Sequence, residues 1–207
     1  MKKIIKASAL AFLLIFAVFA SNCIVVEREV DVVITDEQCL TFPENHTSAN
    51  YTTPDTLFLG DELSQILIDN SVSRSDIVTA HLVSASYQVR DTILAHDWEL
   101  SGEILIKRID IAGSEEVFIA LDTVSVIEAM PAPIGAELEP PGVDIIDQAF
   151  EDFIAGANPI LVFTVVSETG DVDPEPTPGD PMVFTWDACV TVQVVTTIDI
   201  ENIPDPY

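Results

Sequence analysis

Four carboxylates lie close together in a proline-rich segment near the carboxyl end of the chain. They are Asp171, Asp173, Glu175 and Asp180, all within residues 168–181. Hard cations such as Ca²⁺ bind clustered carboxylate oxygens, so these four side chains are the candidate ligands of a metal site. The segment lacks the EF-hand pattern, because no third acid followed by glycine and no closing bidentate glutamate stand at the required spacing. We therefore weigh a Ca²⁺ site against a solvated acidic loop, and the incomplete motif favours the loop.

The histidines offer little for catalysis. None of His46, His81 and His96 belongs to a metal-ligand pair such as H-x-H or H-E-x-x-H. Asp97 could orient His96 as a general base, but the chain has no G-x-S-x-G elbow to supply a nucleophile. We expect His81, which lies inside a predicted strand, to be a packing residue.

Other catalytic and cofactor motifs are missing from the sequence. The 8 glycines are scattered and form neither a Walker loop nor a dinucleotide-binding fingerprint. Carboxylate pairs of the glycosidase kind are so numerous among 35 acidic residues that spacing selects none of them. We therefore predict no catalytic residue and no cofactor, with Ca²⁺ as the one exception considered.

The charge of the chain restricts its partners. Eight Lys and Arg residues face 35 Asp and Glu residues, which gives a formal net charge of −27. Such a surface repels phosphate backbones and anionic lipid headgroups. Nucleic acid is therefore excluded as a partner, and we expect membrane contact only through a signal segment or a lipid anchor. Cations, a basic partner or a glycan remain open.

Residues 1–22 have the pattern of a signal peptide. Lys2, Lys3 and Lys6 precede an apolar run over residues 7–19. That run is too short for a comfortable membrane span and has the flanks of an export signal. Small or tolerated residues at positions 18 and 20 permit cleavage after Ala20 by a general signal peptidase.

Ala20-Ser21-Asn22-Cys23 resembles the lipobox of bacterial lipoproteins, in which the cysteine becomes the lipidated first residue of the mature protein. It differs from that pattern at Ala20, where a Leu-like residue is usual, and at Asn22, where a small residue is usual. The resemblance covers this segment alone and implies an exported bacterial precursor with lipid on Cys23. The alternative is a secreted protein cleaved after Ala20.

The cysteine count bears on the same question. The chain has three, Cys23, Cys39 and Cys189. An exported chain meets an oxidising compartment, where an odd thiol needs an explanation. If Cys23 carries lipid, Cys39 and Cys189 remain for a disulfide that would join the first strand to the last. A bridge between Cys23 and Cys39, with Cys189 buried and free, is the open alternative.

The longest regular pattern is Met182–Ile200. Its even-numbered positions are apolar or β-branched and its odd-numbered positions are mostly polar, which predicts a strand with one buried face. Nineteen residues exceed a usual strand, so we expect a bend or bulge near Asp187 or Thr196 and a contribution to both sheets. We expect residues 160–167 to pair with this strand as a hairpin whose tip is the loop 168–181.

The remaining pattern is read in the same way. Strands are predicted over residues 24–35, 77–90, 97–111 (with a bulge near Lys107–Arg108) and 117–127, helices over 61–70 (capped by Asp61) and 143–155, and connections over 41–56 and 130–142. Strands dominate without regular βαβ alternation. We therefore predict that residues 23–207 form a single mainly β domain, an antiparallel β-sandwich of about seven or eight strands with one or two short covering helices.

These observations favour a non-enzymatic function. We expect an exported bacterial envelope or cell-surface protein with a structural or binding role. A lipid anchor would hold it at the outer membrane, in the periplasm or on the cell surface, and without one it would be secreted. The alternative is a cation- or glycan-binding β-sandwich that uses loops at one end. An extracellular hydrolase with an unrecognised acidic pair is the third hypothesis.

Overall fold

The computed structural model describes residues 28–92 and 97–200, and residues 31–197 form the compact unit discussed below. Its strands are β1 (Arg28–His46), β2 (Tyr51–Leu57), β3 (Ile77–Thr92), β4 (Glu99–Arg108), β5 (Glu116–Ser125), β6 (Ile134–Ala136), β7 (Leu161–Ser167), β8 (Val172–Asp173) and β9 (Met182–Ile200). Its helices are α2 (Leu59–Asp69), α3 (Pro140–Ile154) and the short 3-10 helix η1 (Arg74–Asp76).

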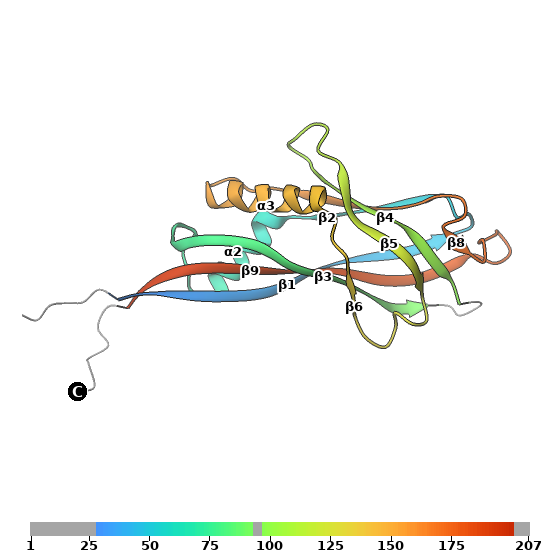
Figure 1. Ribbon diagram of the computed structural model, residues 1–207, viewed down its shortest axis with the longest axis horizontal. Helices are drawn as coiled ribbons and strands as arrows, with labels where there is room; N and C mark the ends of the chain where they lie inside the picture. The colour runs from blue at the N-terminus through green and yellow to red at the C-terminus, as the bar shows by residue number, and fades with distance from the viewer. Residues whose placement is uncertain (1–27, 93–96, 201–207) are drawn as a thin grey trace, which may run out of the picture. The chain divides into compact units, whose positions relative to one another are not determined.

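The strands form two antiparallel sheets, so the predicted β-sandwich is confirmed (Figure 1). The first sheet has the order β1-β9-β3-β6, and the second has the order β2-β7-β4-β5 with β8 paired to β4. The described part of the chain contains nine strands, slightly more than predicted. No helix within that part is both long and apolar enough to cross a membrane.

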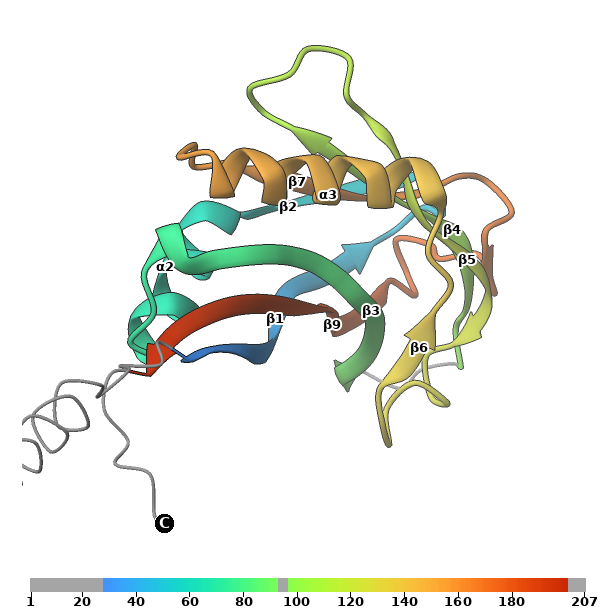
Figure 2. The same cartoon turned by 60° about the vertical axis from the view of Figure 1, so that its left-hand side comes forward.

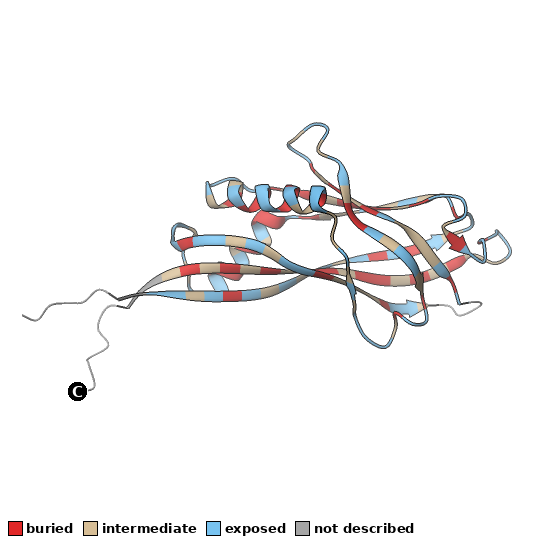
Figure 3. Ribbon diagram, in the orientation of Figure 1, coloured by how far each residue is buried: buried red, intermediate tan, exposed pale blue. Residues whose placement is uncertain are grey.

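The core lies between the facing sides of the two sheets. Buried and exposed residues alternate along the long strands, as expected when one face of each sheet is covered (Figure 3). Phe118 and Phe163 of the second sheet meet edge to face with their ring centroids 5.5 Å apart. In the first sheet Phe42 packs on Trp186 with a centroid distance of 5.2 Å. Strand β9 supplies the longest row of buried side chains, at the even positions that its sequence pattern predicted.

In strand β3, apolar residues occur at both odd and even positions, and the bulges of the strand explain why. Its pairing with β9 shifts register three times, and each shift leaves one extra residue on β3: Val78, Val83 and Arg90. An extra residue moves the following side chains to the opposite face. The inward positions are therefore even between the first and second bulges and odd between the second and third. The irregularities predicted for β9 thus occur in its pairing, but the inserted residues belong to β3, and β9 lies in the first sheet only.

The two helices lie at different edges of the sandwich: α3 covers the side of β3 and β5, and α2 lies beside β1. Helix α3 packs against β3 of the first sheet and against β4 and β5 of the second, as Figure 2 shows from a second side. Its predicted start is three residues late, because Pro140 and Pro141 occupy the first turn, where proline needs no amide partner. Helix α2 begins at Leu59 after Phe58, so Asp61 lies in the first turn and is not the predicted cap.

Two predicted connections contain strands. Strand β1 continues to His46 and β2 follows at Tyr51, although residues 41–56 were expected to form a polar loop. Both strands lie at sheet edges, where Pro43 and Pro54 can be tolerated because an outward-facing amide is not needed for pairing. Strand β6 and the first turn of α3 likewise fall within the predicted connection 130–142.

The predicted hairpin between residues 160–167 and Met182–Ile200 is wrong. Strand β7 pairs with β2 and β4, whereas β9 pairs with β3 in the other sheet. The segment 168–181 therefore crosses between the sheets, and on the way β8 adds a short pair to β4.

The bulge predicted at Lys107–Arg108 is also wrong. The register shifts of β4 against β5 lie earlier, between Leu100 and Gly102 and between Ile104 and Leu105. Position 108 still faces inward, but the residue there is a buried arginine paired with Asp110 and Asp152. The alternation of apolar residues along β4 is interrupted because Arg108 takes an inward position, and no bulge occurs there.

Candidate functional site

Hydrogen bonds attach the acidic segment 168–181 to strand β4 of the second sheet. The backbone N–H of Ser101 donates to the carbonyl of Asp171 (2.7 Å), and the Asp171 carboxylate accepts from the backbone N–H of Glu168 (2.7 Å). Backbone hydrogen bonds of 3.0 Å also join Thr177 and Asp180 in both directions. The carbonyl and carboxylate oxygens of Asp171, which a cation would need as ligands, thus accept hydrogen bonds that hold the turn.

The four predicted metal ligands are not gathered. Asp173 pairs with Glu99 through β8, and both Asp173 and Glu175 are exposed. Within the described ranges, the group of three potential ligand atoms closer than 4.8 Å is Glu37, Cys39 and Cys189, away from the acidic segment. Its two sulfur atoms are bonded to each other, so they cannot act as thiolate ligands.

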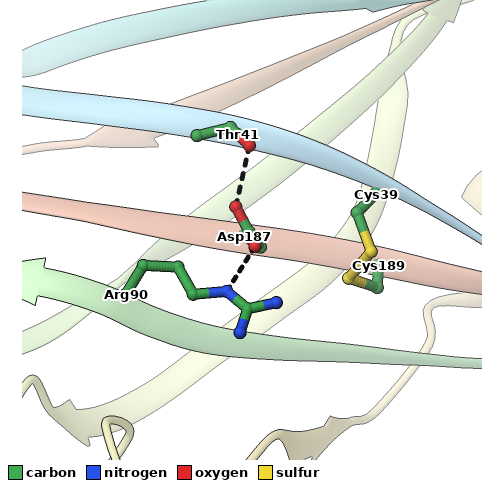
Figure 4. Close-up of a disulfide and its surroundings, with 5 residues drawn as sticks. All are labelled: Cys39, Thr41, Arg90, Asp187 and Cys189. Atoms are coloured by element: carbon green, nitrogen blue, oxygen red, sulfur yellow. Dashed lines mark hydrogen bonds and ion pairs between the residues drawn. A yellow bond between two sulfur atoms is a disulfide. The ribbon is translucent and has the colours of Figure 1, made fainter.

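A disulfide joins Cys39 of β1 to Cys189 of β9, across a sequence separation of 150 residues (Figure 4). Next to it, Asp187 accepts hydrogen bonds from Thr41 Oγ1 (2.8 Å) and Arg90 Nε (2.5 Å). The three neighbouring strands β1, β9 and β3 are therefore cross-linked side by side on one face of the sheet. Sequence reasoning considered this disulfide but treated Asp187 only as a polar outward residue. The third cysteine, Cys23, lies outside the described residues.

The most buried polar cluster surrounds Glu44. Its side chain is fully covered, and both of its carboxylate oxygens are occupied. Trp186 Nε1 donates to Oε1 at 3.0 Å, Thr53 Oγ1 donates to Oε2 at 2.8 Å, and His46 Nε2 lies 2.5 Å from Oε2. The His46 ring stacks on Tyr51 with a centroid distance of 3.8 Å.

The local fold explains how this cluster forms. Even positions of β1 face the core, so Glu44 and His46 point inward two residues apart. The short connection to β2 then brings Tyr51 and Thr53 over them from the second sheet. Ser167 Oγ holds that connection by donating to the carbonyl of Ala49 at 2.8 Å. The sequence did contain one indication of this cluster: the inward-facing even positions of β1 continue beyond Leu40, through Phe42, to Glu44.

A small cavity of about 30 Å³ adjoins the cluster between the two sheets. Its lining is mostly aliphatic and aromatic, with the side chains of Tyr51 and Ser167 on the cluster side. Burial, and then the nearby charge of Glu44, raise the pKa of Tyr51 far above its ordinary value of 10.0, although a hydrogen bond with Ser167 opposes the shift. Tyr51 therefore keeps its proton at neutral pH. The volume suffices for about one or two water molecules.

This arrangement supports a stabilising role for Glu44 better than a catalytic one. A general base needs a lone pair directed at a substrate proton. The Glu44 carboxylate has no exposed surface, so a substrate proton cannot reach it, and both of its oxygens accept hydrogen bonds from neighbouring side chains. His81 was expected to be a packing residue but is exposed on β3, opposite Gln193 of β9. His96 lies outside the described residues.

Comparison of the chain with protein-family models and with curated proteins gave no match. The functional assignment therefore depends on the residues themselves.

Proposed function

We propose that this chain is an exported bacterial envelope or cell-surface protein whose β-sandwich has a structural or binding role. The observation that supports export is the disulfide between Cys39 and Cys189. Disulfides persist in oxidising compartments such as the periplasm and the cell surface and are rare in the cytosol. The same chain begins with the charge and hydropathy pattern of a signal peptide.

The disulfide also supports a lipid anchor. With Cys39 and Cys189 bonded to each other, the third cysteine is Cys23, the residue that the lipobox resemblance assigns to lipid. A lipidated Cys23 would account for the odd number of cysteines in an oxidising compartment. We therefore propose that Cys23 is the lipidated first residue of the mature protein.

The non-enzymatic role is supported by the use of the buried polar groups. Glu44, the most enclosed carboxylate of the described chain, accepts hydrogen bonds from Trp186 and Thr53 and contacts His46. Such a network holds the sheets together, and the covered carboxylate is out of reach of a substrate in solution.

The test is expression of the full precursor in a bacterial host with labelled palmitate, followed by the intact mass of the recovered protein. We expect a diacylated mass beginning at Cys23, label in the membrane fraction, and no free thiol. Cys23→Ser should abolish the label and release the protein, while Ser21→Ala, a change between small residues two positions before the cysteine, should leave both unchanged. A protein that starts at Ser21 and is secreted would remove the anchor from the proposal. An unprocessed protein with three free thiols in the cytosol would overturn export.

A further inference from the structure

A groove of about 460 Å³ runs between strand β1 and helix α2. Its strand side consists of residues 32–36 and Gln38, and its helix side is one row of residues on α2 that includes Glu62, Ile66 and Asp69. Pockets that hold ligands have volumes of about 300–1,000 Å³. The groove is therefore large enough for several side chains.

The strand side of this groove is a free sheet edge. Strand β1 pairs with β9 only, and no other described strand lies along its outer side. The outward backbone N–H and C=O groups of an edge strand are a template for another strand. Proteins often block such edges with proline. Pro43 blocks the far half of β1, but the part that lines the groove contains no proline.

Both sides of the groove carry negative charge. Asp36, Glu62 and Asp69 all line the groove, and none of them belongs to a salt bridge among the described residues. Asp36 accepts from Gln38 Nε2 and Asp69 accepts from Gln65 Nε2, each at 2.7 Å, so their charges are hydrogen-bonded but not neutralised. From residue 31 to residue 73 the chain has eight acidic residues and neither Lys nor Arg.

The spacing of the charges suits an extended partner. Glu62 and Asp69 are two helical turns apart, which separates them by about 10.5 Å along the helix. Residues two and four apart in a strand are about 6.6 and 13 Å apart, so the long side chains of alternate Lys or Arg residues can reach both carboxylates. Val33, an odd-numbered residue of β1 that also lines the groove, is 55% exposed and would contact the partner's other side chains.

We propose that the β1–α2 groove binds an extended cationic peptide segment, which pairs with residues 32–38 of β1 as an additional strand. Its alternate Lys or Arg side chains face Asp36, Glu62 and Asp69, and its intervening apolar side chains lie beside Val33. Backbone pairing supplies affinity and the carboxylates select positive charge. This inference names the partner class for the binding role proposed above, and its test does not depend on lipidation.

A second copy of the chain fits this edge poorly. The net charge is −27, and pairing two β1 edges would bring two acidic grooves together. Like charges facing each other across an interface oppose association. The charge therefore favours a basic partner over self-association.

The experiment measures the binding of three labelled nine-residue peptides to the protein recovered after export, by fluorescence anisotropy at low salt. One peptide alternates Lys with Val, one alternates Lys with Pro, and one alternates Glu with Val. The Lys–Pro peptide keeps the charge but removes half of the backbone donors. We expect the Lys–Val peptide to bind, the Glu–Val peptide not to bind, and the Lys–Pro peptide to bind at least about tenfold more weakly, which is 1.4 kcal/mol.

Two matched variants locate the site. Glu62→Gln with Asp69→Asn should weaken the Lys–Val peptide about tenfold, whereas Asp144→Asn with Asp147→Asn, the same charge change on the exposed face of α3, should change affinity less than about twofold. Amide hydrogen exchange should slow at residues 32–38 in the complex.

Equal weakening by both variant pairs, or equal binding of the Lys–Pro peptide, would show diffuse attraction and overturn the proposal. So would a dimer in sedimentation that protects residues 32–38 without peptide. Failure here with a correctly lipidated Cys23 would leave the export proposal intact.

Discussion

At the scale of single residues, Glu44 shows how a charge can lie inside an apolar core. Removing a carboxylate from water costs several kcal/mol unless hydrogen bonds and charges compensate. Here the compensation comes from both sheets, because Trp186 belongs to β9 and Thr53 belongs to β2. The cluster therefore fixes the spacing of the two layers at the edge where β1 continues into β2.

Replacing Glu44 should reveal this contribution. Glu44→Leu removes the acceptor of Trp186 Nε1 and of Thr53 Oγ1, so we expect the free energy of unfolding to fall by about 3 kcal/mol. Glu44→Gln keeps one carbonyl oxygen and should cost about 1 kcal/mol. Urea unfolding followed by tryptophan fluorescence measures both. Glu37→Gln, an exposed change on the same strand, should stay within about 0.5 kcal/mol. A Leu variant as stable as this control would contradict the structural role.

Tyr51 gives a prediction for alkaline pH. Its folded pKa is raised above the ordinary 10.0, chiefly by burial and then by the charge of Glu44. Because the folded state disfavours the phenolate, the stability from Tyr51 is complete below about pH 10 and is lost as the pH rises through and beyond that value. We expect the melting temperature to fall steeply above about pH 10, and to fall less steeply in Tyr51→Phe.

Thermal melts across this pH range, with phenolate absorbance recorded in parallel, test the prediction. Burial also raises the pKa of Tyr87, so Tyr51→Phe should still lose some stability at high pH. Equal slopes for the wild type and Tyr51→Phe would show that Tyr51 ionises without affecting stability.

At the scale of elements, the sequence patterns succeeded where a strand has one buried face and no insertion. Strand β9 has the predicted bounds because its alternation is unbroken from Met182 to Ile200. Strand β2 was missed because Pro54 and Asp55 are turn-forming residues, and only its place at a sheet edge makes Pro54 acceptable. The bulges of β3 were hidden because each one moves the apolar pattern to the other face.

The candidate site was predictable only in part. Counting cysteines led to Cys39 and Cys189 as one of two open pairings, since the number of cysteines is itself informative. The contact between Glu44 and Trp186 joins residues 142 positions apart, and no local pattern announces it. The β1–α2 groove was hidden for the same reason, because it requires knowing which strand is at the edge.

Gly142 tests how α3 is seated on the second sheet. A Cβ atom at this position would lie 2.5 Å from Phe118 Cα and 2.6 Å from the carbonyl oxygen of Val117, both backbone atoms of β5. Gly142→Ala must therefore push the start of α3 off the strand, and we expect a loss of about 1–3 kcal/mol in unfolding free energy. Gly179→Ala meets no atom within 4 Å and serves as the control. Chemical denaturation measures the unfolding free energy of both variants. Equal values would show that α3 can shift without a loss of stability.

At the scale of the whole molecule, the first and last long strands of the chain, β1 and β9, lie side by side in the first sheet. Strand β1 has a neighbour on one side only, so its attachment depends on its hydrogen bonds to β9, on the Asp187 contacts and on the disulfide. An edge strand with a free side is the element most easily lost by local opening. The disulfide therefore matters most to the strand that also lines the proposed peptide groove.

Removal of this disulfide should act globally and locally. Cys39→Ser with Cys189→Ser frees a loop of 150 residues in the unfolded chain, and we expect a loss of about 2–4 kcal/mol in unfolding free energy. Because β1 is held on one side only, its amides should exchange faster relative to those of the central strand β4. Hydrogen exchange with mass spectrometry measures both strands, and a reductant should make the wild type behave like the variant. Equal acceleration in β1 and β4 would mean that the bridge stabilises the domain as a unit and does not specifically retain its edge strand.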